Sequence, residues 1–319
     1  MEKRRDLGPL EDFIAAMRSR MERDAADVKP WHSFWYHRPA KRFPPATTER
    51  PDQYDGSDRL AVSCTQSDLP AREQRSLVSQ WCKTLPRLER VEFLWFHSKV
   101  LPEMFEAACR MPNLVGLCIN WSSVQSLEPL GDHSGLRYLR IGSSPGIVSL
   151  EPLARLLQLR WLELADLKRV TDIDDLESLR RLIGFSFDGP GGSAYAVPSW
   201  KPLENMTELA WLKLGAVRSA DGSLRSLAKL KQLKWLGLAR DYDMKEFAWL
   251  ASQLPKTECA WLHPFDTLAW EKCRRCKTAQ MVMLSGKGKP CLCPKCDASK
   301  LAKHVQEFEL LVRRGQRDG

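Results

Sequence analysis

One apolar pattern recurs along the middle of the chain. Seven segments carry apolar residues at positions 0, +3 and +5 from a leucine, and these leucines are Leu88, Leu114, Leu136, Leu159, Leu182, Leu209 and Leu233. Successive starts lie 22 to 27 residues apart, and Lys256, Cys259 and Trp261 form a degenerate further turn. The +3 and +5 positions share one face of a short strand. A period of this length predicts a solenoid whose turns each add one strand to a parallel sheet.

The pattern extends upstream of each start in the five middle turns. Position −6 is leucine in all five, at Leu130, Leu153, Leu176, Leu203 and Leu227, and position −9 is also apolar throughout. A single turn of this size cannot cover its own apolar face, so each turn must stack on a neighbour and the outermost turns need caps.

The stretches 124–141 and 147–164 carry nearly the whole pattern, and they resemble the leucine-rich-repeat family, in particular the short-repeat bacterial type of internalins. The resemblance covers about residues 85–265. It implies an α/β fold with a parallel sheet on a concave face that binds other macromolecules. The chain departs from the family in the turn after the strand, where the usual asparagine is replaced by Ser122, Ser144, Leu167, Pro190, Val217 and Asp241.

Three regions follow from this pattern. Residues 1–84 are expected to form an N-terminal cap, with helical stretches at 11–26 and 71–82 and a strand at 60–62. Residues 85–265 form a solenoid of about eight turns. Residues 266–319 form a small separate module that ends in a helix. The segment 31–45 is rich in proline and aromatic residues, and its pattern predicts no element.

The concave face should be formed by positions +2, +4, +6 and +7, because strand side chains alternate between faces. Aromatic residues are frequent there and have charged neighbours, which is typical of a protein-binding surface. The predicted partner-binding residues are Trp95, Trp121, Tyr138, Arg140, Trp161, Glu163, Trp211, Lys213 and Trp235. In the alternative interpretation, neighbouring rings only stack along the sheet and stabilise it.

The C-terminal module contains two CxxC pairs, Cys273/Cys276 and Cys293/Cys296, separated by sixteen residues. This spacing is typical of a structural zinc ribbon in which each pair forms a knuckle. Zn²⁺ is therefore the expected cofactor, and such sites contribute on the order of 10–16 kcal/mol to folding in zinc-finger peptides. Cys291 stands close enough to Cys293 in the sequence to replace it as a ligand.

The net charge of +9 is concentrated in this module, where residues 270–319 hold twelve Lys/Arg against five Asp/Glu. Four thiolates and one zinc ion would reduce the local excess from +7 to about +5. Basic residues of a ribbon can bind phosphates, so the alternative function is DNA or RNA binding through Arg274, Arg275, Lys277, Lys287, Lys289 and Lys295.

No spacing in the chain matches a catalytic motif. The chain has Gly-rich stretches at 188–192 and 285–289, and neither has the GxxxxGK[ST] pattern of a phosphate loop. The sequence therefore predicts a non-enzymatic protein with no small-molecule substrate. No apolar run is long enough for a membrane span, and the basic start is followed by acidic residues where a signal peptide would be apolar. We expect a cytoplasmic scaffold that binds a protein partner.

Overall fold

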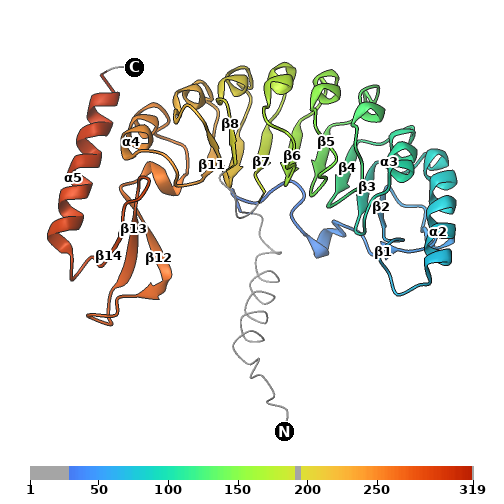
Figure 1. The fold of residues 1–319 in the computed structure, drawn as a ribbon, viewed down its shortest axis with the longest axis horizontal. Coiled ribbons are helices and arrows are strands. Elements are labelled where there is room, and N and C mark those ends of the chain that lie inside the picture. Colours follow the sequence, from blue (N-terminus) through green and yellow to red (C-terminus); the bar gives the residue numbers. More distant parts are fainter. Residues whose placement is uncertain (1–28, 191–194, 318–319) are drawn as a thin grey trace, which may run out of the picture.

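A computed structural model describes residues 29–190 and 195–317. The predicted helix at 11–26 lies outside this part of the chain. Across the described residues the chain forms an arch, with a parallel sheet on its inner side and short helices on its outer side (Figure 1). No described helix is long and apolar enough to cross a membrane.

The inner sheet has nine strands, all parallel, in the order β1-β2-β3-β4-β5-β6-β7-β9-β11. Their bounds are β1 Thr47–Thr48, β2 Arg59–Val62, β3 Phe93–Phe96, β4 Gly116–Ile119, β5 Tyr138–Ile141, β6 Trp161–Ala165, β7 Gly184–Asp188, β9 Trp211–Gly215 and β11 Trp235–Leu238. The strands from β4 onward start at the predicted +2 positions, and the strand expected at 60–62 is β2. The sheet begins at Thr47, inside the region expected to cap the solenoid.

The outer side carries the helices that connect successive strands. The helices are α2 Ala71–Thr84, α3 Pro102–Cys109 and α4 Met244–Gln253, with 3₁₀ helices η3 Leu85–Arg87, η4 Glu128–Leu130, η5 Glu151–Arg155, η6 Asp174–Ser178, η7 Lys201–Asn205, η8 Arg225–Lys229 and η9 Ala260–Leu262. The five middle turns, from β4 to β11, carry only 3₁₀ helices, whereas the 23-residue turn between β3 and β4 carries α3. The position −6 leucines lie in η4 to η8 and are fully buried. Two further strands, β8 Tyr195–Val197 and β10 Val217–Ser219, pair beside the main sheet.

The first turn corrects the predicted register. Leu94 pairs with Leu117, and Val91, Leu94 and Phe96 are all fully buried in the main core. The turn therefore starts at Val91, three residues after the Leu88 expected from the pattern. Both registers place apolar residues at the required spacing, and the sheet selects the one that buries all three side chains. Phe93, expected to point inward, instead belongs to the aromatic cluster on the concave face.

Serine replaces asparagine in the turns after β4 and β5. The Ser122 and Ser144 hydroxyls are 2.7 Å apart and buried, and Ser122 Oγ also accepts the backbone N–H of Val124 at 3.2 Å. Ser144 Oγ donates to the carbonyl of Gly142 at 2.6 Å. These hydrogen bonds satisfy some of the buried backbone N–H and C=O groups of the turn, a role that an asparagine side chain would otherwise have.

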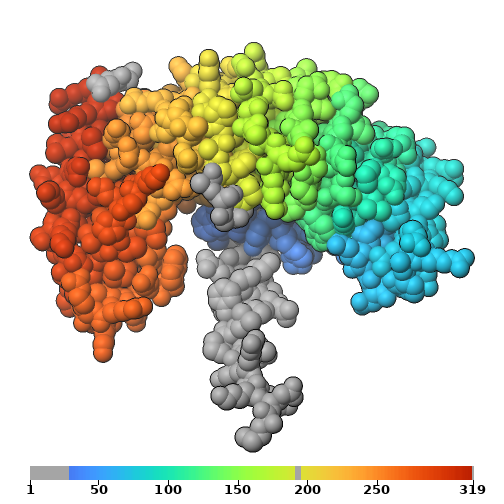
Figure 2. All heavy atoms as spheres, viewed as in Figure 1, coloured from blue at the N-terminus to red at the C-terminus, as the bar shows by residue number. Residues whose placement is uncertain are grey.

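The segment 29–46, which contains the stretch 31–45 for which the sequence predicted no element, lies against the inner side of the arch (Figures 1 and 2). It contains the short helix η1 Pro39–Lys41, and η2 Pro51–Gln53 follows it between β1 and β2. Trp35 and Phe43 are buried in an apolar cluster separate from the main core, together with Trp95 and Trp161. Trp35 and Phe43 of this segment are therefore buried against the aromatic residues of the concave face.

The C-terminal module is fixed to the last turns of the solenoid. Strands β12 Phe265–Lys272, β13 Gln280–Leu284 and β14 Cys291–Leu292 form an antiparallel ribbon, and helix α5 Ala298–Gly315 packs beside α4. The Arg240 guanidinium donates to the carbonyls of Leu284 and Lys289, at 3.2 and 3.1 Å. Phe308 of α5 is buried in the main core. These contacts hold the ribbon beside the concave face.

Candidate functional site

Three tryptophans, on β6, β9 and β11, form a row of contacting rings at the C-terminal half of the concave face. The ring centroids of Trp161 and Trp211 are 4.9 Å apart, and those of Trp211 and Trp235 are 5.2 Å apart with the planes at 19°. Glycines leave room for these rings: a Cβ at Gly184, in β7 between Trp161 and Trp211, would overlap the Trp161 ring, and one at Gly237 of β11 would lie 2.7 Å from Trp235. The stacking that the sequence raised as an alternative therefore exists. It buries Trp161 and Trp211 and leaves Trp235 half-buried.

The other half of the concave aromatic surface is covered by the chain itself. Phe34 stacks on Tyr138 with centroids 4.0 Å apart, and Phe43 meets Trp95 edge to face at 4.8 Å. Trp95 is only 2% exposed as a result. Within the described residues, Tyr138 and Trp95 are therefore contacted by segment 29–46 where a partner was expected.

A cavity of about 800 Å³ lies on the part of the concave face that this segment leaves open. Three tryptophans line it, Trp31 from the N-terminal segment and Trp211 and Trp235 from the sheet. Asp266 of β12 contributes from the ribbon. The cavity thus combines residues from three regions far apart in the sequence, and its volume is in the range of ligand-binding pockets.

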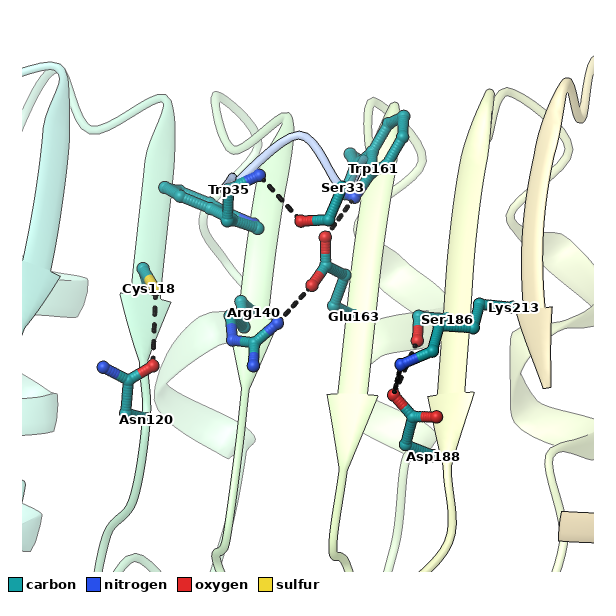
Figure 3. Close-up of polar contacts among 10 residues, drawn as sticks. All are labelled: Ser33, Trp35, Cys118, Asn120, Arg140, Trp161, Glu163, Ser186, Asp188 and Lys213. Carbon is teal, nitrogen blue, oxygen red and sulfur yellow. Dashed lines mark hydrogen bonds and ion pairs between the residues drawn. The ribbon is translucent and has the colours of Figure 1, made fainter. Parts of the chain in front are cut away.

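Two ion pairs cross the strands that line the cavity (Figure 3). Arg140 of β5 pairs with Glu163 of β6, and Glu163 also accepts the indole N–H of Trp161 at 2.7 Å. The Glu163 side chain is 4% exposed, so this carboxylate is held by both partners away from water.

The second pair joins Lys213 of β9 to Asp188 of β7 at 2.7 Å, and Ser186 donates to the same carboxylate oxygen at 3.3 Å (Figure 3). Position 215 is glycine, and a Cβ there would collide with the other oxygen of Asp188. Asp266, the third carboxylate in the cavity, has no ion-pair partner in the described part of the chain.

Five of the nine predicted partner-binding residues line this cavity: Arg140, Glu163, Trp211, Lys213 and Trp235. Trp161 does not line the cavity, but it is buried next to it and donates its indole N–H to the cavity residue Glu163. Trp95 and Tyr138 lie under segment 29–46, and Trp121 lies half-buried just after β4, where its indole N–H donates to Gln66 at 2.6 Å.

Five further residues line the cavity that were not among the predicted partner-binding residues: Trp31, Ser33, Ser186, Asp188 and Asp266. Ser186 and Asp188 stand at the concave positions +4 and +6 of their turn, so the positional rule contained them. Trp31 and Asp266 belong to segments outside the repeat, and no periodicity could have assigned them. The density of aromatic residues in 31–45 was the available signal that this segment needs an apolar surface.

The structure brings the four predicted cysteines of the ribbon together. The sulfur atoms of Cys273, Cys276, Cys293 and Cys296 all lie within 4.8 Å of one another. The Cys276–Cys293 and Cys273–Cys296 sulfur distances are 3.7 and 3.9 Å. Zinc–thiolate bonds of about 2.3 Å in a tetrahedron place sulfur atoms about 3.8 Å apart, so the cluster matches the size of a Zn²⁺ site.

Backbone N–H groups point at these sulfur atoms. The N–H of Cys296 donates to Cys293 Sγ at 3.3 Å, and hydrogen bonds from Ala279 and Thr278 lower the pKa of Cys276 to about 5. Such donors favour the thiolate form that binds metals. Cys291 lies outside the cluster, exposed in β14 and opposite Met283.

The predicted nucleic-acid residues differ in their surroundings: the N–H of Lys287 donates to the carbonyl of Tyr242 in the solenoid at 2.8 Å, whereas Arg274, Lys277 and Lys295 stand in or beside the cysteine knuckles. Arg275 is paired with Asp297, and Lys289 is half-buried, with its carbonyl bound to Arg240. Four remain exposed without an ion pair among the described residues: Arg274, Lys277, Lys287 and Lys295. Near the first knuckle Trp270 is 79% exposed, the highest value among the large apolar residues described.

The architecture defines a class of protein: a leucine-rich-repeat solenoid with a four-cysteine ribbon at its C-terminal end. No protein-family model matches the chain, and no curated protein matches it. Among solved structures it is similar to internalin C2 of Listeria monocytogenes, with 21% identity and a TM-score of 0.44 over 56% of this chain and 80% of that one. Internalin F of the same organism is 16% identical with a TM-score of 0.37, over 62% of this chain and 70% of that one. A leucine-rich-repeat protein of Leptospira interrogans is 14% identical with a TM-score of 0.47, over 67% of this chain and 51% of that one. The fold assignment follows from this chain's own period and sheet.

Proposed function

We propose that this protein is a non-enzymatic recognition scaffold that binds a protein partner in the cavity on the C-terminal half of its concave face. The observation that carries the proposal is the cavity itself, where tryptophans and cross-strand ion pairs surround about 800 Å³ of open space. Tryptophan and arginine are enriched among the residues that dominate binding energy at protein interfaces.

The division of the concave face supports the same conclusion. Where segment 29–46 covers the sheet, Trp95 is buried and Tyr138 is half-buried, and both rings contact the segment. In the cavity, Trp31 remains 46% exposed and Trp235 is half-buried. Large apolar side chains left at an open concave surface are typical of an interaction site.

Photo-cross-linking tests this function. A benzophenone amino acid replaces Trp31 in the cavity, and the control replaces Leu157, which is 54% exposed and lies outside the cavity. We expect a discrete protein adduct in a lysate of the source cells at position 31 and not at 157, and we expect Trp235→Ala to abolish it. Equal adducts at both positions, or none at position 31, would overturn the proposal.

We also propose that the four cysteines bind a structural Zn²⁺ ion. A closed set of four thiolates has no open position for substrate, so the metal would hold the two knuckles together. The ribbon has only a small apolar cluster of its own, centred on Val282, Leu284 and Leu292. Domains with so small a core need a further cross-link, such as a structural metal ion. Reduced thiolates also suit the cytoplasmic location predicted from the sequence.

A second candidate function is binding of single-stranded nucleic acid by the ribbon, and the observation that favours it is Trp270. Exposed aromatic rings beside basic residues allow bases to stack while phosphates meet positive charge. Fluorescence anisotropy with labelled single strands over a salt series tests it, comparing Trp270→Ala with the matched Trp31→Ala. We expect salt-dependent binding that only Trp270→Ala removes, and no binding at low salt would exclude this function.

A further inference from the structure

The charges that line the cavity do not balance. Arg140 is neutralised by Glu163 and Lys213 by Asp188, each within a cross-strand ion pair. Asp266 faces the same cavity from β12 and is half-buried, with no ion pair in the described chain. With both bases and all three acids ionised, the cavity therefore has one uncompensated negative charge.

The walls of the cavity are suited to the opposite charge. Trp211 and Trp235 are stacked against each other on the sheet, and Trp31 approaches from the N-terminal segment. The face of an indole ring attracts a cation more strongly than any other side-chain ring does. Trp211 is flanked by Trp161 and Trp235 and is 6% exposed, so a cation in the cavity would meet Trp31, Trp235 and the free carboxylate of Asp266.

Other ligand classes fit less well. An anion would have to compete with Glu163 and Asp188 for Arg140 and Lys213 and would also face Asp266. A neutral apolar group would remove water from the Asp266 carboxylate and offer it no partner, which costs free energy. A cationic group offers Asp266 an ion pair and leaves the two existing pairs intact.

From this charge complementarity we infer that the cavity binds a cationic side chain, arginine or lysine, that projects from the protein partner. The inference rests on the proposed scaffold function and specifies the chemistry of the partner at that site. The guanidinium group of arginine can stack on indole while it donates to a carboxylate, and lysine can supply the same charge at a point.

The test uses the full chain labelled with ¹⁵N and the peptide acetyl-Gly-Arg-Gly-amide, with the neutral isostere acetyl-Gly-citrulline-Gly-amide as its control. The readout is the indole N–H signals of Trp31 and Trp235. We expect saturable shifts with the arginine peptide and at least about fivefold weaker binding of the citrulline peptide, which keeps the shape but loses the charge. The lysine peptide should bind like the arginine peptide.

Variants of single carboxylates locate the charge. Asp266→Asn should weaken the arginine peptide about fivefold and leave the citrulline peptide unchanged. Asp68→Asn is the matched control, since Asp68 is exposed without an ion pair among the described residues and lies near β2, at the other end of the sheet. Equal binding of the two peptides, an unaffected Asp266→Asn variant, or no shifts at millimolar peptide would each overturn the inference.

The two proposals can fail separately. If the cross-link at position 31 forms, persists in Asp266→Asn and is not competed by the arginine peptide, the scaffold stands and the cation inference is wrong. If no cross-link forms but the arginine peptide shifts both indole signals, the cavity binds cations without serving a protein partner. Thermal unfolding of Asp266→Asn must match wild type, because the substitution preserves the side-chain shape.

Discussion

Phe34 lies flat on Tyr138, with ring centroids 4.0 Å apart and planes at 10°. One ring belongs to the N-terminal segment and the other to β5, in the middle of the sheet. Phe34 also meets Trp35 and Phe43 edge to face, at 5.1 and 5.4 Å. This contact joins the segment to the concave face and so sets the limit of the open cavity.

We predict that Phe34→Ala loosens this segment while the solenoid stays folded. Because Phe34 is only half-buried, the loss should be roughly 1–2 kcal/mol, below the 3–5 kcal/mol typical of a fully buried phenylalanine. Limited trypsin digestion measures it, since Lys41 and Arg42 follow in the segment and neither precedes a proline. Cleavage there should accelerate relative to wild type and to the exposed control Leu157→Ala. An unchanged cleavage rate would mean that the stack does not hold the segment.

The Arg140–Glu163 pair should contribute more to stability than a surface pair of the same chemistry. Glu163→Gln leaves Arg140 without its counter-charge beside a buried amide, and we expect a loss of about 1–3 kcal/mol. Glu128→Gln is the matched control, because Glu128 and Arg155 are 60% and 40% exposed and such pairs are worth about 0–1 kcal/mol. Urea unfolding midpoints of the two variants compare them directly, and equal shifts would contradict the assigned role of burial.

Gly184 should tolerate no side chain. A Cβ there would overlap the Trp161 ring, so Gly184→Ala must displace the tryptophan stack, and overpacking of this kind costs about 1–3 kcal/mol. Gly135→Ala is the control, since its Cβ would meet only ordinary contacts at 3.8 Å and beyond. Thermal unfolding and tryptophan emission should change in the first variant alone. A shift of the same size in both would show that the effect is general to glycine replacement.

The repeat, the sheet and the cysteine cluster could be predicted because each depends on local spacing. Leu162, Leu212 and their equivalents recur at a fixed interval, and the two CxxC knuckles form their own turns. The register of the first turn could not be predicted, because Leu88/Val91/Phe93 and Val91/Leu94/Phe96 satisfy the same pattern. The cavity could not be predicted either. Trp31 and Asp266 reach it through packing between segments some 235 residues apart in the sequence, and no local pattern records that contact.

Cys293 and Cys291 should differ in their effect on metal content. Cys293 lies in the sulfur cluster and Cys291 lies outside it. Cys293→Ser should therefore lose most of the bound zinc and leave the ribbon open to trypsin, while Cys291→Ser should keep one zinc per chain by elemental analysis. Chelation of the wild type should reproduce the first result, with the solenoid's far-ultraviolet circular dichroism retained. Zinc loss in Cys291→Ser would assign the fourth ligand to that residue.

Acid should weaken the attachment of α5 through His304. This side chain is buried, and its ring nitrogen Nε2 lies 2.8 Å from the carbonyl oxygen of Pro264. Burial lowers the pKa of His304, and the charge of Lys289 lowers it further, whereas the bond to Pro264 and the charge of Glu307 act in the opposite direction.

His304 in the folded state therefore binds its second ring proton less readily than it does in the unfolded chain, where the histidine pKa is about 6.5. The contribution to stability is present above pH 6.5 and is lost as the pH falls from there toward the lower pKa of the folded state. His304→Gln can keep a donor to Pro264 but does not titrate, so its free energy of unfolding should change less between pH 7.5 and pH 5 than that of wild type. His97, whose pKa is also lowered by burial, should supply part of the remaining slope. Parallel pH profiles of wild type and His304→Gln would show that His304 does not contribute to the acid sensitivity.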